Sequence, residues 1–312
     1  MARDSWSGLG TVTVGGVVLA NPVMTASGTA GHDTELGAYF DVSLLGAVVV
    51  KSLYHAPWPG NPAPRVHVAG SGMINAVGLE GPGVEAWCAE SLPRLRAAGA
   101  TTVASIWGRS VEEYRSAAAQ VARHPGPVAV EVNLSCPNLE GRNSIFAHDP
   151  VLSAEVVAAV AAESGVPVWA KLSANTDRIV DVAGAVMSAG ASAVTLINTL
   201  LGMQIDTVTR RPSLGNGGGG LSGPPVHPVA VRAVHDVAVA LPGIDIIGVG
   251  GISSGRDAVE MMLAGARAVQ VGTATFARPD ASLRILRAAA REARRAGAAS
   301  WRELSGAALT AR

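Results

Sequence analysis

The two lysines are the first residues whose type points to chemistry. Of the 24 basic side chains, 22 are arginine, and only Lys51 and Lys171 are lysine. Arginine and lysine are not interchangeable at tight sites, because lysine offers a compact ammonium on a flexible stem. Each lysine also closes an apolar run, 46–50 and 166–170. We therefore expect both to serve a polar site; the alternative is chance retention on a solvated surface.

Cys136 is the second candidate, because it lies between Asn133 and Asn138 in a polar, proline-containing segment. A thiol among hydrogen-bonding side chains suits a base or a nucleophile, although most free cysteines are buried as small apolar residues. No histidine lies near it in the sequence, so the pattern does not favour a Cys–His hydrolase. Cys88 lies in a helical pattern over 85–90 and is expected to pack in the core.

Asparagines near the ends of apolar runs form a third group. An amide donates and accepts hydrogen bonds without charge, so a cluster of them suits a flat polar ring with imide-like edges. Each one alone is more often a turn or cap residue. The group comprises Asn75, Asn133, Asn138 and Asn198.

Glycines follow the last two apolar runs, as Gly250-Gly251 and as Gly272-Thr273. In a barrel, the loops after the seventh and eighth strands commonly hold a phosphate through backbone N–H groups. The sequence has no Gly-x-x-x-x-Gly-Lys-Ser/Thr motif, which excludes a P-loop nucleotide site. It also has no His-x-x-x-His or Cys-x-x-Cys spacing, so we expect no metal site.

The elements that must position these residues are short apolar runs alternating with helical patterns. Such alternation indicates βαβ units, and eight of them predict an α/β fold of the (β/α)₈ TIM-barrel type, with the site at the carboxyl ends of the strands. A doubly wound sheet is the alternative. The expected strands are 22–26, 46–52, 101–106, 127–133, 166–172, 192–197, 244–249 and 267–272, and the expected helices are 110–123, 150–164, 177–189, 226–240, 255–264 and 280–296.

Three segments depart from this alternation. Residues 11–19, with Gly15-Gly16 at their centre, predict an N-terminal β-hairpin that could plug the bottom of the barrel. Long insertions follow the second and sixth strands, at 53–100 and 199–224, and loops of this length are usually functional. Residues after 296 are expected to form a surface tail. We expect one domain over 1–312.

Composition excludes several classes of protein. The 312 residues are 48% hydrophobic and only 15% charged, which argues against disorder. The net charge is zero, so no global field would attract nucleic acid or anionic lipid. No signal-peptide core or membrane-length apolar run is visible, and two cysteines make no disulfide scaffold. The cytoplasm is therefore the expected compartment.

Five motifs together identify a family. They are Asn133-Leu-Ser-Cys-Pro-Asn138, Lys51-Ser52, Asn75-Ala-Val-Gly-Leu79, Lys171-Leu-Ser-Ala-Asn175 and Gly250-Gly-Ile-Ser-Ser-Gly255. With them the chain resembles the class 1 dihydroorotate dehydrogenases, flavin enzymes of pyrimidine biosynthesis, over about residues 8–295. Residues 198–203 and 219–224 look most like the class 1B catalytic subunit.

The resemblance implies FMN-dependent oxidation of (S)-dihydroorotate to orotate. Cys136 would be the general base that removes the C5 proton, while the C6 hydride passes to flavin N5. Substrate contacts would come from Lys51, Asn75, Ala76, Val77, Gly78, Leu79, Asn133, Asn138, Asn198 and Thr199. FMN contacts would come from Ala26, Ser27, Lys51, Ser52, Asn133, Lys171, Ile197, Gly223, Gly250, Gly251, Gly272 and Thr273.

The class 1 enzymes that this chain resembles differ in their electron acceptor. Class 1B enzymes use a partner subunit that carries FAD and an iron–sulfur cluster and passes electrons to NAD⁺, whereas class 1A enzymes use fumarate. This chain lacks the cysteines for such a cluster. The resemblance also implies a homodimer, with no nucleic-acid or membrane role. Two alternatives are a related flavin oxidoreductase acting on another dihydropyrimidine-like or specialised-metabolite substrate, and a barrel without flavin chemistry.

The chain departs from the family pattern at three positions. Ser105 stands where the family often has asparagine, and Trp107 is bulkier than the small residue expected there. Ala174 replaces a common proline in the motif around Lys171. The first departure bears on flavin contacts, so we expect any effect of these changes at the cofactor rather than at the catalytic group.

Overall fold

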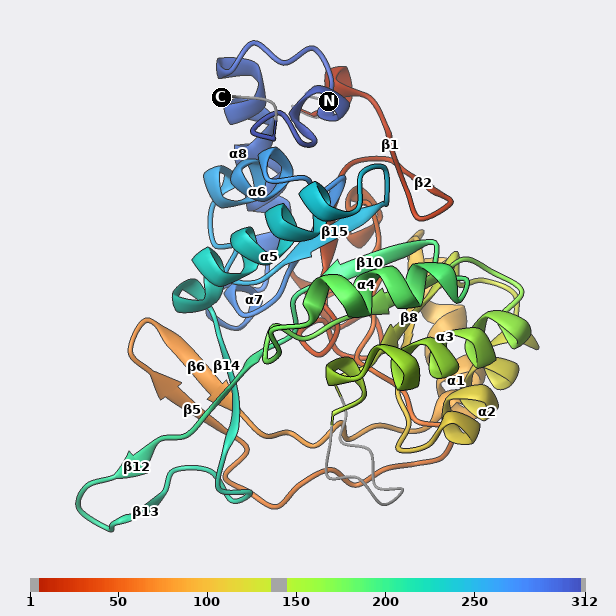
Figure 1. Cartoon of the computed structure of the whole chain (residues 1–312), viewed down its shortest axis with the longest axis vertical. Helices are drawn as coiled ribbons and strands as arrows, with labels where there is room; N and C mark the ends of the chain where they lie inside the picture. The colour runs from red at the N-terminus through yellow and green to blue at the C-terminus, as the bar shows by residue number, and fades with distance from the viewer. Residues whose placement is uncertain (1–5, 136–144, 310–312) are drawn as a thin grey trace.

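A parallel eight-stranded sheet forms the centre of the computed structural model, which describes residues 6–135 and 145–309 (Figure 1). Its strand order is β3-β16-β15-β10-β9-β8-β7-β4. A parallel bridge between Met24 and Ala47 joins the first strand to the last, so the sheet closes into a barrel. The strands are β3 (Val23–Thr25), β4 (Val48–Val49), β7 (Thr102–Ile106), β8 (Ala129–Asn133), β9 (Val168–Lys171), β10 (Ala193–Leu196), β15 (Ile246–Val249) and β16 (Ala268–Val271).

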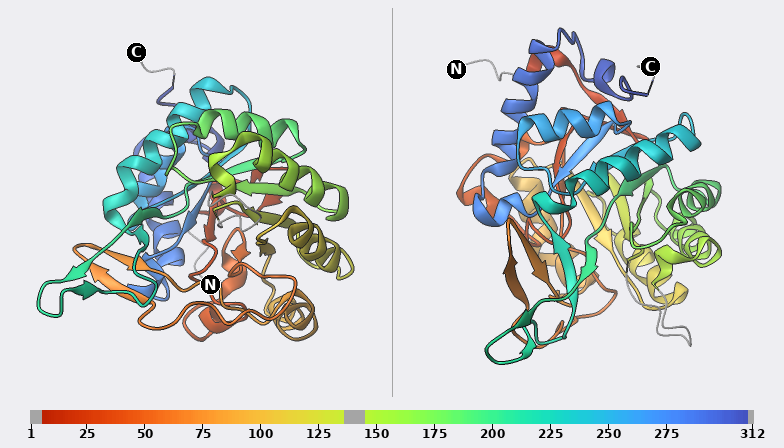
Figure 2. Two further views of the ribbon diagram at one scale, coloured as in Figure 1. Left: turned by 60° about the horizontal axis from the view of Figure 1, so that its bottom comes forward. Right: turned by 60° about the vertical axis from the view of Figure 1, so that its left-hand side comes forward.

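Helices cover the outside of this barrel (Figure 2). Every strand residue of the barrel is buried, as expected of strands packed on both faces. Side-chain caps define several helix starts, including a capping box between Ser254 and Asp257. The helices are α1 (Val84–Ala97), α2 (Val111–Ala122), α3 (Pro150–Glu163), α4 (Ile179–Ser188), α5 (His227–Ala240), α6 (Gly255–Leu263), α7 (Ala274–Ala277) and α8 (Ala281–Arg295). The predicted barrel is therefore confirmed.

The predicted N-terminal hairpin is present as β1 (Val12–Val14) and β2 (Val17–Leu19). Its turn touches the base of the barrel, where the Gly15 carbonyl accepts a 3.1 Å hydrogen bond from Trp169 Nε1. The Gly15 N–H donates to Asp245 at 2.7 Å. A Cβ on Gly15 would lie 2.2 Å from Trp169 Nε1, so only glycine fits this contact. The hairpin thus packs against the end of the barrel interior.

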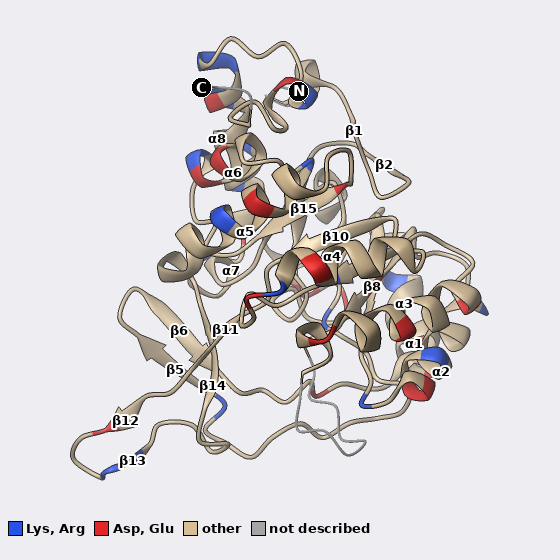
Figure 3. Ribbon diagram, viewed as in Figure 1, with Lys and Arg blue, Asp and Glu red and all other residues tan. Residues whose placement is uncertain are grey.

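The two long insertions meet in a second sheet, which the sequence did not reveal. This four-stranded antiparallel sheet has the order β11-β14-β6-β5 and joins the insertion after β4 to the one after β10. Its strands are β5 (Val66–Ala69), β6 (Gly72–Asn75), β11 (Leu200–Gly202) and β14 (Gly219–Ser222), and a small arm beyond it holds β12 (Ile205–Asp206) and β13 (Arg211–Pro212). None of its four strands carries a charged residue (Figure 3).

Two sequence-based expectations need correction or refinement. The insertion 53–100 contains the helix α1, so it is a hairpin followed by a barrel helix rather than one loop. Residues after 296 are not a simple surface tail, because they include a short 3₁₀ helix, η6 (Trp301–Leu304), whose Trp301 is fully buried. In Figures 1 and 2 this helix and the neighbouring N-terminal 3₁₀ helix η1 (Ser7–Leu9) lie at the opposite end of the molecule from β5, β6 and β14.

The helices of residues 6–135 and 145–309 are too short or too polar to span a membrane.

Candidate active site

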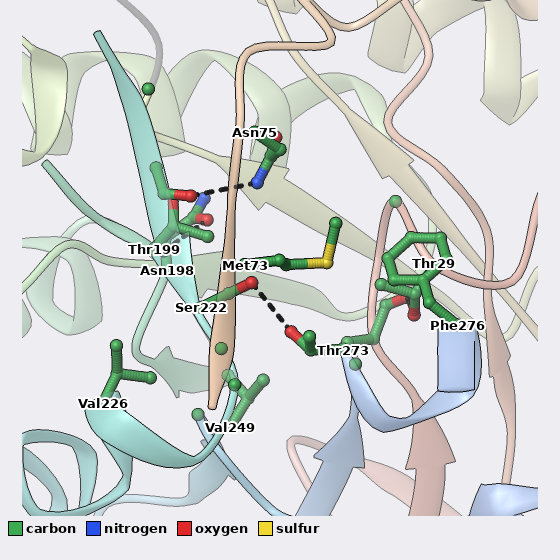
Figure 4. A pocket seen from close by; sticks show the side chains of 18 of the residues that line it. Thr29, Met73, Asn75, Asn198, Thr199, Ser222, Val226, Val249, Thr273 and Phe276 are labelled. Atoms are coloured by element: carbon green, nitrogen blue, oxygen red, sulfur yellow. Dashed lines mark hydrogen bonds between the residues drawn. The ribbon is translucent and has the colours of Figure 1, made fainter. Parts of the chain in front are cut away.

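A cavity of about 1420 Å³ opens at the carboxyl ends of the barrel strands, beside the four-stranded sheet (Figure 4). Ligand pockets typically measure about 300–1,000 Å³, so this cavity has room for a cofactor together with a small substrate. Every predicted site residue in the described part of the chain lines it. Cys136 and Asn138 lie outside the described residues. The structure thus brings the predicted set together, and the role of each residue remains a prediction.

Loops after the last two strands form one end of the cavity, where Gly250, Gly251, Gly272 and Thr273 meet the end of β14. Thr273 Oγ1 donates a 2.8 Å hydrogen bond to Ser222 Oγ across this end. Gly251 has a φ of +66°, and a Cβ there would lie 2.8 Å from the carbonyl oxygen of Gly223. The glycines therefore let the loops pack backbone to backbone at the cavity wall, which fits an anion held by main-chain N–H groups.

Lys171 lies at the end of β9 and is 3% exposed. Its Nζ donates hydrogen bonds to Ser27 Oγ at 3.2 Å and to Gln270 Oε1 at 3.3 Å. Glu131 Oε1 lies 3.7 Å from the same Nζ. Glu131 and Gln270 were not among the predicted site residues, although a glutamate in the middle of the apolar strand 129–133 is a signal for such a buried pair.

Two of the predicted asparagines, Asn133 and Asn198, are hydrogen-bonded to each other at the cavity. Asn133 Oδ1 accepts a 3.1 Å hydrogen bond from Asn198 Nδ2, and Asn133 Nδ2 donates to Ser52 Oγ at 3.4 Å. Asn75 reaches the cavity from β6 and donates to the carbonyl of Gly220 at 3.2 Å. Three amides from different elements thus converge on one cavity, as their chemistry led us to expect.

Asn175 was part of a sequence motif but was not assigned a role. Its Nδ2 donates to the Thr199 carbonyl at 3.0 Å, and its Oδ1 accepts from the Leu201 N–H at 2.8 Å. The side chain therefore fixes the start of the second insertion, which carries Thr199 at the cavity wall.

Lys51 borders both this cavity and a second one of about 640 Å³. Burial lowers the pKa of its ammonium, and the nearby Arg65 lowers it further, although Glu80 raises it. His32, which shares the second cavity, has its pKa lowered to about 4 by burial and by Lys51. Among the described residues, no carboxylate lies within ion-pair distance of Lys51. Its charge is therefore available to an anionic ligand.

The two unusual residues near β7 do not line the cavity. Ser105 is fully buried behind Ser52, and their hydroxyl oxygens are 2.8 Å apart. Trp107 stacks on Tyr54 with ring centroids 4.7 Å apart and meets Trp58 edge-on. Trp107 thus packs within an aromatic cluster, and Ser105 is linked to the cavity wall by its contact with Ser52.

Over residues 6–135 and 145–309, no group of three or more His, Cys, Asp or Glu side chains is placed to hold an ion.

The fold and the site together define a (β/α)₈ barrel with glycine loops and a lysine-containing polar wall around a cavity at its mouth, where enzymes of this fold have their active sites. Comparison with known proteins gives the family. The family model for dihydroorotate dehydrogenase matches residues 10–291. The chain belongs to the dihydroorotate dehydrogenase family, and it is therefore an FMN-dependent oxidoreductase.

Curated relatives agree with this placement. A protein of Geotalea uraniireducens is 44% identical over 300 residues, covering 96% of this chain and 98% of its own length. One of Desulforudis audaxviator is 49% identical over 276 residues, covering 88% of this chain and 89% of its own. Both are named dihydroorotate dehydrogenase B (NAD(+)), catalytic subunit.

Proposed function

We propose that this chain oxidises (S)-dihydroorotate to orotate in pyrimidine biosynthesis, as the catalytic subunit of a class 1B enzyme. The observation that carries the proposal is the convergence of two lysines and three amides on one cavity of a family member. A dihydropyrimidine carboxylate needs one cation for its carboxylate and uncharged donors and acceptors for its ring edges.

FMN fits the wall that runs from Lys171 to the glycine loops. Ser27, Ser52 and Asn133 would contact the flavin with Lys171, while Gly250, Gly251, Gly272 and Thr273 would hold the phosphate. Ala26, Ile197 and Gly223 complete the proposed cofactor contacts. When bound, FMN supplies the hydride acceptor for substrate C6.

Lys51 and the asparagines would hold the substrate. Lys51 has no carboxylate partner within residues 6–135 and 145–309 and would offer its ammonium to the substrate carboxylate, while Asn75, Asn133 and Asn198 would offer amides to the ring. Asn138, which lies outside the described residues, would join them by its place in the motif. Thr199 and the backbone of 76–79 complete the proposed contacts.

Cys136 would remove the C5 proton. The residues on either side of the segment that contains it, Ser135 and Ile145, both line the cavity, which supports a position for the thiol at the site. A thiol with an ordinary pKa of about 8.5 is partly ionised near neutral pH, so it can serve as a general base.

A partner chain would take the electrons. The relatives are named as catalytic subunits of an NAD(+) enzyme, which supports a second subunit. We propose that this partner carries FAD and an iron–sulfur cluster, because two cysteines are too few to hold such a cluster in this chain. A homodimer of this chain and a cytoplasmic location, both implied by the class 1 resemblance, complete the proposal.

Anaerobic titration of the purified protein with dihydroorotate tests the proposal without any acceptor. We expect a yellow protein whose oxidised-flavin absorbance bleaches with about one equivalent of substrate, because one hydride reduces one flavin. Dithionite added to a second sample confirms that the flavin is reducible. If the flavin bleaches with dithionite but not with dihydroorotate, the proposed substrate is wrong. The chain would then be a flavin oxidoreductase that acts on another substrate.

A further inference from the structure

Glu131 is a buried carboxylate that the proposed reaction does not use. It lies in β8, is fully buried, and is near Lys171, which lines the cavity. Its Oε2 accepts hydrogen bonds from Gln270 Nε2 at 2.5 Å and from Thr195 Oγ1 at 3.1 Å. Its Oε1 makes no hydrogen bond and faces Lys171 Nζ at 3.7 Å. One oxygen is therefore fixed by neutral donors, and the other is left to the ammonium.

Lys171 is the cation that offsets this charge. An unpaired ion is costly to bury, and within residues 6–135 and 145–309 Lys171 is the one basic side chain in ion-pair distance of Glu131. Lys171 has three donors, of which Ser27 and Gln270 take two. The third is available to a ligand in the cavity that Lys171 lines. Lys171 thus presents a hydrogen-bond donor to the cavity. Glu131, which does not line the cavity, partly neutralises the positive charge of Lys171.

This pairing has an electrostatic consequence for a bound flavin. Reduction adds negative charge to the ring system, so a fixed positive charge beside it favours the reduced form. A carboxylate behind that cation weakens the effect. Lys51, the other lysine at the cavity, has no such partner among the described residues, so the two lysines differ in the net charge they present.

We propose that Glu131 is a positioning residue that orients Lys171 and sets the flavin reduction potential by offsetting its charge. The proposal rests on the proposed contact of Lys171 with the flavin. Gln270 belongs to the same group, because its side-chain amide bridges Glu131 and Lys171. It donates a hydrogen bond to Glu131 and accepts one from Lys171. The effect would keep the bound flavin a weaker oxidant than Lys171 alone would make it, and so ease electron release to the acceptor.

The test is the midpoint potential of FMN bound to the Glu131→Gln variant, measured by anaerobic reductive titration against redox dyes. Glutamine keeps the size and most hydrogen bonds but removes the negative charge. We expect the two-electron reduction equilibrium of the bound flavin to move at least tenfold toward the reduced form. This shift corresponds to a rise of about 30 mV in the midpoint potential. The variant Glu131→Asp keeps the charge and should stay closer to the parent potential.

Three further variants make the result interpretable. Lys171→Met should lower the potential, and adding Glu131→Gln to it should change little, because Glu131 is proposed to act by offsetting the charge of Lys171. Thr102→Val removes a buried hydroxyl at the far end of β7 and controls for general destabilisation. An unchanged or lower potential in Glu131→Gln would overturn the proposal. If Lys171→Met also leaves the potential unchanged, the proposed contact between Lys171 and the flavin is what has failed.

If Glu131→Gln does not fold with FMN, the Asp variant decides alone. Aspartate keeps the negative charge but has a shorter side chain, so a folded, flavin-loaded Glu131→Asp should show a shift of the reduction equilibrium toward reduced flavin that is smaller than tenfold. A shift away from reduced flavin, or a shift of tenfold or more toward it, would contradict the proposal. None of these measurements requires dihydroorotate, so failure of this inference is distinguishable from failure of the proposed substrate.

Discussion

At the scale of single residues, the two lysines show how similar side chains acquire different tasks from their surroundings. Lys171 is nearly inaccessible and has Glu131 at 3.7 Å. Lys51 is only partly buried and faces two cavities. A buried cation with a counterion tunes its surroundings, whereas an unpaired cation at a cavity wall attracts an anion.

Replacing Lys51 by alanine should weaken orotate binding roughly 10- to 100-fold, the usual worth of a hydrogen bond to a charged group. The shift of a flavin absorbance band on orotate addition measures the affinity. Thr102→Val, which alters a buried hydroxyl away from the cavity, provides the control. Equal affinity in the alanine variant would contradict the pairing with the substrate carboxylate.

The lowered pKa of Lys51 also predicts a pH dependence. Because burial lowers this pKa, the ammonium loses its proton at a lower pH than a free lysine does. Orotate affinity should therefore fall as pH rises into the alkaline range, earlier than the ordinary lysine pKa of about 10.4 would allow. Titration of Lys51→Ala over the same range removes any contribution from orotate itself, and parallel curves for the two proteins would refute the assignment.

Cys136→Ser should keep the flavin but lose roughly 100-fold or more of its turnover near neutral pH, since general bases usually contribute about 10²–10⁴-fold. Serine is a much weaker acid than cysteine, so partial recovery at high pH is expected. Flavin reduction by dihydroorotate in a stopped-flow instrument measures the step directly. Turnover equal to the parent at neutral pH would remove Cys136 from the reaction.

At the scale of elements, the N-terminal hairpin depends on a glycine that nothing larger can replace. The replacement Gly15→Ala would put a Cβ 2.2 Å from Trp169 Nε1 and 2.8 Å from the Ala193 Cβ. We expect a loss of about 1–3 kcal/mol in the free energy of unfolding, the usual range for an overpacked contact. Chemical denaturation with and without FMN measures it.

Gly10→Ala is the matched control for that prediction. Gly10 also has a positive φ, +76° against +53° at Gly15, but a Cβ there would meet nothing within 4 Å. Both variants carry backbone strain, so the difference between them reports the contact with Trp169. Equal losses in the two proteins would show that the hairpin turn does not bear on barrel stability.

The sequence predicted the barrel well because buried parallel strands are continuous apolar runs. It did not predict the four-stranded sheet, because β5, β6, β11 and β14 are short, rich in glycine or half-exposed, and paired across 145 residues between Asn75 and Gly220. At the site, strand ends placed the polar residues correctly. Glu131 and Gln270 were not predicted, because they lie inside strands, whereas the polar residues of a barrel site are expected where the strands end.

At the scale of the whole molecule, the proposed electron path includes a second chain. We expect the isolated protein to reduce its flavin with dihydroorotate once but to turn over slowly with NAD⁺. Co-expression with a partner carrying FAD and an iron–sulfur cluster should restore NAD⁺ reduction. Steady-state assays with NAD⁺ and with fumarate separate the two acceptors, and rapid turnover of the chain alone with fumarate would contradict the class 1B assignment.

The placement of η1 and η6 has a practical consequence for studying that electron path. Both short helices lie at the opposite end of the molecule from β5, β6 and β14, the sheet beside the cavity. A tether attached near either one would hold the molecule on an electrode or a sensor chip with the cavity turned toward the solution. Immobilised in this orientation, the protein could be titrated with substrate, dyes or a partner chain while its coenzyme is monitored in place.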